Sequence, residues 1–182
     1  MRIEDPSKGE MSNAQRKVAE ESASGKRGHL PAPLRAWLHS PEFGNRAQRL
    51  GEYLRYDTSL PPALSELAIL VTARFWTAHY EWYAHKREAL KAGIQASVID
   101  AIATRATPAL DDARAAAVYT YTCTLLTSGR VDDALHAEAV KQIGTQGVVE
   151  LVGIIGYYSL VAMTLNAFEI DLPDGVTPEL QP

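Results

Sequence analysis

The chain has 182 residues, of which 46% are hydrophobic and 22% are charged, and this predicts a single soluble globular domain. Its formal net charge is −4 and it has no block of basic residues, which argues against nucleic acid or an anionic membrane as a partner. The single cysteine, Cys123, excludes an internal disulfide, and we interpret it as a small buried core residue. Because the N-terminal stretch is polar and lacks an apolar signal segment, we expect a cytoplasmic protein.

Turn residues and helical periodicity predict an all-α protein of about eight helices, with no segment of sustained strand alternation. We expect residues 1–11 to form a mobile arm, 12–173 a single helical domain and 174–182 an extended tail. Ser40-Pro41-Glu42 is typical of a helix start, with a cap, a proline in the first turn and an acidic residue near the dipole.

That helix should run to about Tyr56, with Phe43, Ala47, Leu50 and Leu54 facing inward.

Near the C-terminus, Asp132 should start a helix that Gly144 stops, and a long last helix should follow. Its apolar run, residues 151–165, is shorter than the roughly 20 residues needed to span a bilayer. We therefore expect a helix that is buried on all sides. A monomer of this size would not comfortably cover it, so we predict a homo-oligomer, either a trimer or a hexamer of two trimers.

The most informative stretch is residues 63–93, where apolar residues at helical spacing surround three groups able to carry protons. Glu66 lies in an apolar segment, where a carboxylate is costly to bury without a partner. Glu81 and His85 are four residues apart, so they share one face of a helix. On one straight helix Glu66 and His85 would lie about 28 Å apart. The aromatic and β-branched residues at 75–77 favour a break near Thr77, which would let the chain fold back.

The spacing of Glu66, Ala78, Glu81 and His85 resembles the carboxymuconolactone decarboxylase / alkyl hydroperoxidase D (AhpD) family. Ala78 and Glu81 stand where the redox branch of that family has its Cys-x-x-Cys pair. The segments 49–62, 80–94 and 151–170 are similar to the decarboxylase-like branch. The resemblance spans about residues 27–173 and implies an AhpD-like helical bundle, a break near Thr77, an oligomer of trimers or hexamers, and a site at Glu66 and His85.

Two interpretations of Glu81 and His85 remain open on the sequence, a solvated ion pair on a helix surface or a proton-transfer site. The aromatic residues around them, with the family pattern, favour the second. His85 could then give and take a proton near neutral pH, while Glu81 orients the ring and Glu66 binds the other ring nitrogen or shuttles the proton.

For substrate binding we consider Arg27, Arg55 and Arg74, because arginine binds carboxylates bidentately, and favour Arg74, which is nearest in sequence to the site. The aromatic residues expected to contact the substrate are Tyr80, Trp82 and Trp76. A metal site made by His79, Glu81 and His85 would lack a recognised zinc-binding arrangement. We therefore expect no metal and no cofactor.

The resemblance implies a cofactor-free lyase that decarboxylates a small carboxylated lactone or a related acid. An AhpD-like thiol peroxidase is disfavoured, since a two-thiol cycle cannot run on Cys123 alone. The alternative from another class is a non-catalytic oligomer that keeps the fold and binds a small ligand.

Overall fold

The computed structural model describes residues 1–181, which fold into helices joined by loops and contain no strand. This confirms the predicted all-α fold. The elements are one short 3-10 helix and eight α-helices: η1 (Pro6–Lys8), α1 (Asn13–Ser24), α2 (Leu34–Trp37), α3 (Pro41–Tyr56), α4 (Pro62–Phe75), α5 (His79–Lys91), α6 (Ala96–Ala103), α7 (Ala113–Ser128) and α8 (Asp133–Ala167).

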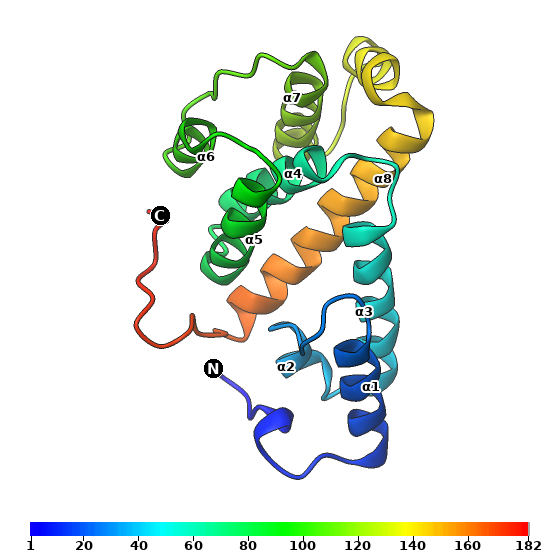
Figure 1. Cartoon of the computed structure of the whole chain (residues 1–182), viewed down its shortest axis with the longest axis vertical. Helices are drawn as coiled ribbons and strands as arrows, with labels where there is room; N and C mark the ends of the chain where they lie inside the picture. The colour runs from blue at the N-terminus through cyan, green and yellow to red at the C-terminus, as the bar shows by residue number, and fades with distance from the viewer. Residues whose placement is uncertain (182) are drawn as a thin grey trace.

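Helix α8 is the central element, and it runs obliquely between α1–α3 at one end of the molecule and α4–α7 at the other (Figure 1). Gly144, with φ 72° and ψ 164°, interrupts α8 near its start, at the residue where the sequence predicts a boundary. By length and composition α8 could cross a membrane, but 61% of its most apolar window is buried inside the protein. Leu151 and Ile154 are fully buried, but Val152 and Met163 are 42% and 45% exposed, so the prediction that this helix is buried on all sides was wrong.

Helix α3 presents a different face to the core from the one predicted. Ala47 and Leu54 are buried, but Phe43 is 42% exposed and Leu50 is 51% exposed. The buried face is instead built on two glycines: Gly44 approaches the backbone of α2, and Gly51 approaches α8. Larger side chains would not fit there, so periodicity of large apolar residues misidentified the inward face.

Helices α4 and α5 are separated by a tight reversal at Thr77, as predicted. Thr77 has a positive φ of 48°, and the Ala78 amide donates to the Ala73 carbonyl at 2.8 Å. This hydrogen bond ends α4 in a Schellman motif, with threonine where glycine is usual. The reversal lays α5 back along α4, so Glu66 and His85 come from two adjacent helices.

Both chain ends are held against the helices. Among the first eleven residues, predicted as a mobile arm, the Met1 amino group binds Asp171 at 3.0 Å and Asp5 binds Arg35 at 2.7 Å. The C-terminal segment is extended as expected, yet Leu180 in it is only 3% exposed. That segment runs along the outside of α5 (Figure 1).

Candidate functional site

A cavity of about 140 Å³ lies where α5, α8 and the loop at residues 27–33 meet, and we call it the His85 cavity. Glu81 and His85 line it, as do Tyr157 and Tyr158 from α8. The other lining groups that matter chemically are Arg27, His29, Arg55, Tyr80, Tyr83 and Arg87.

His85 is held by Glu66, which lies behind it on α4. The Nδ1 atom of His85 is 2.8 Å from Glu66 Oε2, and both residues are buried, at 6% and 7% exposure. The ring of Tyr158 meets the imidazole edge to face, with centroids 4.9 Å apart. A carboxylate that accepts from Nδ1–H leaves Nε2 as the basic nitrogen, and no group among residues 1–181 hydrogen-bonds to Nε2. The imidazole is therefore oriented and still free to exchange a proton.

Glu81 is the second proton-carrying group of the cavity, and it makes no bond to His85. It is 2% exposed, and neither carboxyl oxygen has a hydrogen-bond partner within residues 1–181. Burial raises the pKa of Glu81 well above its ordinary value, and the nearby charge of Glu66 adds to the rise. A carboxyl group in that environment keeps its proton to a higher pH than an ordinary glutamate, so it can serve as a proton donor.

The structure gives Glu66 and Glu81 roles that differ from the ones the sequence favoured. Glu66, and not Glu81, orients the histidine ring. Glu66 is not among the residues that line the cavity, whereas Glu81 is. The arrangement thus contains a buried Glu–His pair and, beside it, an unpartnered carboxylic acid that faces the cavity.

Three guanidinium groups, those of Arg27, Arg55 and Arg87, give the cavity a positive side. None of them forms a salt bridge within residues 1–181; Arg55 stacks over Tyr56 and Arg87 over Tyr83. Arg27 lies beside Tyr157 in the wall of the cavity, and its buried Nε has no partner in the described chain. Unpaired guanidinium groups around an acid and a histidine fit an anionic ligand.

The structure places the other predicted substrate-binding residues apart, except for Tyr80, which lines the cavity. Arg74 lies in the last turn of α4, eight residues after Glu66, which is about 12 Å along the helix axis. It donates to the Gln181 carbonyl at 2.7 Å, and Trp82 donates to Glu179 at 3.3 Å.

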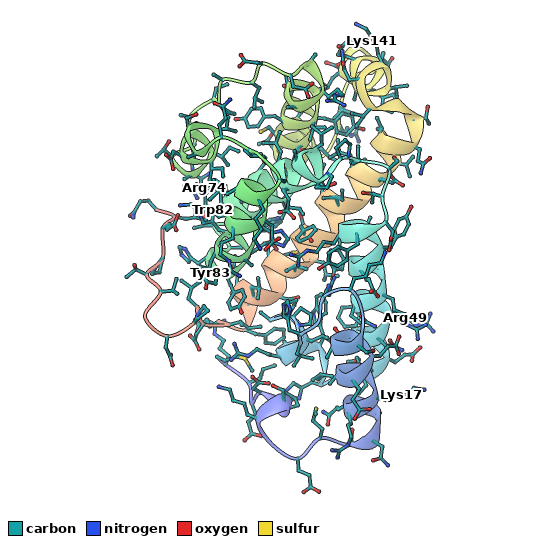
Figure 2. The ribbon with its side chains drawn as sticks, in the orientation of Figure 1. Lys17, Arg49, Arg74, Trp82, Tyr83 and Lys141 are labelled. Carbon is teal, nitrogen blue, oxygen red and sulfur yellow. The ribbon has the colours of Figure 1, made fainter. Side chains whose placement is uncertain are left out.

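Both side chains therefore contact the C-terminal segment, on the side of the molecule where Figure 2 labels them. Trp76, also outside the cavity, donates to Ser159 of α8 at 3.0 Å.

Sequence reasoning missed Arg87, Tyr158 and the loop residue His29 as cavity residues. Because Arg87 follows His85 closely in α5, its position in the sequence could have indicated that it lines the same cavity. Tyr158 and His29 come from segments far from α5 in sequence, and no local pattern indicates that they meet it.

No group of three or more histidine, cysteine, aspartate or glutamate side chains within residues 1–181 is arranged to hold a metal ion. His79 lines a different cavity, with Asn166 and Asp171.

Comparison with known proteins shows a likeness to one family over part of the chain and a shared fold. Residues 41–122 match the model of the carboxymuconolactone decarboxylase family. Among solved structures, an uncharacterized peroxidase-related protein from Silicibacter sp. TM1040 superposes with a TM-score of 0.76 and 15% identity, covering 93% of this chain and 90% of that one.

The debrominase Bmp8, solved in complex with 2,3,4-tribromopyrrole, superposes with a TM-score of 0.68 and 14% identity, covering 95% and 90%. No curated protein matches the sequence. These likenesses confirm the predicted resemblance and the AhpD-like fold.

Proposed function

We propose that this chain, which carries the carboxymuconolactone decarboxylase family domain over residues 41–122, is a cofactor-free lyase that removes CO2 from a small carboxylated lactone or a related acid. The proposal rests on one observation: the oriented His85 and the buried acid Glu81, which has no hydrogen-bond partner within residues 1–181, both line one arginine-lined cavity.

Binding is assigned to the guanidinium groups. Arg27 and Arg55 would hold a carboxylate that the product retains, because two charge-assisted hydrogen bonds fix its position and orientation. The carboxylate that leaves would face the uncharged part of the wall, where loss of its hydration favours departure as CO2. A cavity of about 140 Å³ limits the substrate to one small ring or a short chain. The ligand of the debrominase neighbour, 2,3,4-tribromopyrrole, is a single ring, which supports this size.

Proton transfer completes the reaction. When the C–C bond to the departing carboxylate breaks, its electron pair stays on the ring carbon and delocalises into the adjacent carbonyl. Glu81 then donates its proton to that carbon, and His85 Nε2 takes a proton from solvent and passes it to the Glu81 carboxylate, which restores the acid. Glu66 holds the ring through Nδ1 and stabilises the imidazolium that forms transiently.

The test is CO2 release from a panel of small lactone acids incubated with the purified protein. His85→Ala should abolish turnover, and Glu81→Gln should lower it by about 100-fold, since it keeps the shape and removes the transferable proton. His136→Ala is the matched control, because His136 is an exposed histidine that lies outside this cavity. Equal activity of His85→Ala and the parent would favour a non-catalytic, ligand-binding protein instead.

We also propose that the protein is a homo-oligomer, a trimer or a hexamer. One exposed stripe of α8 carries Val149, Val152, Gly156 and Met163. Val149 is 67% exposed, Val152 is 42% exposed and Met163 is 45% exposed. Their spacings of three, four and seven residues keep them on one helix face. An apolar stripe on the central helix supports contact with another copy of the chain.

A further inference from the structure

A second cavity, of about 180 Å³, lies between α4, α6 and α7, and we call it the Arg105 cavity. None of the residues that line it also lines the His85 cavity. Its apolar wall is formed by Val71, Phe75, Ile102, Ala106 and Leu126. An apolar cavity of about 150 Å³ can hold a benzene ring, so this one has room for a single-ring compound.

Two guanidinium groups converge at one end of this cavity. Arg74 Nη1 donates to Thr77 Oγ1 at 2.9 Å, and Arg105 Nη2 approaches the same oxygen at 3.5 Å. Neither arginine forms a salt bridge with an acidic group in the part of the chain that the structure describes. Burial lowers the pKa of Arg74, and the charge of Arg105 lowers it further. Two cations that share one hydroxyl repel each other unless an anion lies between them.

Arg74 also has an unused donor. The residue is 5% exposed, and its Nε is buried without a hydrogen-bond partner in residues 1–181, while Nη2 donates to the Gln181 carbonyl at 2.7 Å. A buried N–H without an acceptor destabilises the protein, so a site that leaves one open is suited to a ligand that supplies the acceptor.

The backbone holds this arrangement in place. Thr77 and Arg105 are two of the three non-glycine residues with positive φ in residues 1–181, at 48° and 61°. Each follows the end of a helix, at the position where glycine is usual. Such conformations persist only where surrounding contacts maintain them, and they gather at binding sites.

We propose that the Arg105 cavity binds a small carboxylic acid with a single-ring apolar body, separately from the His85 cavity. The carboxylate accepts from Arg74 and Arg105 in the fork geometry that guanidinium groups favour. The ring packs on Phe75, Ile102 and Leu126, where it leaves water. Inorganic phosphate would satisfy the charges but would leave the apolar wall empty.

Cys123 provides a local readout, since it lines this cavity and is the only cysteine in the chain. The experiment measures how fast iodoacetamide alkylates Cys123 at mildly alkaline pH as benzoate is added. Benzoate should protect the thiol with a saturable dependence on concentration. Benzyl alcohol, which has the ring without the charge, should protect about tenfold more weakly.

Arg105→Gln should shift the benzoate concentration for half protection upward by about tenfold, because it removes one charge-assisted partner. Arg130→Gln is the matched control, since Arg130 is exposed and lies outside the cavity. A circular dichroism melt checks that both variants fold. His85→Ala should leave the protection unchanged, which separates this site from the proposed lyase site.

Three outcomes would overturn the proposal: no protection by benzoate, equal protection by benzyl alcohol, or full protection in Arg105→Gln. A fourth outcome that would overturn it comes from a variant that lacks residues 181–182, in which Arg74 Nη2 no longer has the Gln181 carbonyl as its acceptor. The deletion should tighten benzoate binding, whereas protection seen only after the deletion would mean that the chain's own end occupies the site.

Discussion

Glu81→Gln should make the protein more stable above neutral pH while removing its proton donor. In the folded protein, burial first and the charge of Glu66 second raise the pKa of Glu81. In the unfolded chain the same group ionises at its ordinary pKa. Between these two values the folded state binds the extra proton, so the free energy of unfolding falls as pH rises through the interval.

The size of the effect follows from the pKa shift. Each unit by which the pKa is raised costs about 1.4 kcal/mol of stability above the folded-state pKa. Glutamine cannot ionise and has nearly the same shape, so it does not incur this cost. The variant should match the parent near pH 4 and become increasingly more stable than the parent towards pH 8, by about 1.4 kcal/mol for each unit by which the pKa is raised.

Urea unfolding followed by circular dichroism at pH 4 to 8 measures this difference. Glu138→Gln is the control, because Glu138 is exposed and hydrogen bonds from Gln142 and Lys141 lower its pKa. The stability gain of Glu138→Gln over the parent should not increase as pH rises. A stability difference between Glu81→Gln and the parent that stays constant across the range would refute the assignment of Glu81 as a neutral buried acid.

Three further changes test the fold around the site. Gly51→Ala should destabilise the protein by about 1 to 3 kcal/mol in urea unfolding, because its Cβ would lie 2.0 Å from the Tyr157 hydroxyl; a more stable variant would contradict this. Burial would raise the pKa of Glu150, but hydrogen bonds from Ser59, Gln146 and Tyr53 together outweigh it and lower the pKa, so Glu150→Gln should destabilise at pH 7 and less so in acid. Val152→Glu should reduce the mass in light scattering to that of a monomer; an unchanged mass would exclude the α8 stripe as the interface.

The sequence determined what depends on neighbours along the chain. Pro41 and Gly144 marked helix boundaries because the backbone preferences of proline and glycine are local properties. The predicted cap was wrong, since the Ser40 side chain makes no capping hydrogen bond. The spacing of Glu81 and His85 placed them on one helix, and the break at Thr77 could be predicted from poor helix formers. The single cysteine excluded dithiol chemistry without any structure.

Tertiary structure decided which of these groups meet. Glu66 reaches His85 across two helices, and this contact, rather than the spacing of four residues, orients the ring. Of the three arginines considered, Arg74 was nearest to the site in sequence, yet the C-terminal segment binds it, while Arg27 and Arg55 reach the cavity from distant segments. Phe43 and Leu50 were assigned inward by periodicity, but α3 packs through glycines. Such outcomes depend on how helices pack, and side-chain volumes at long-range contacts set that packing.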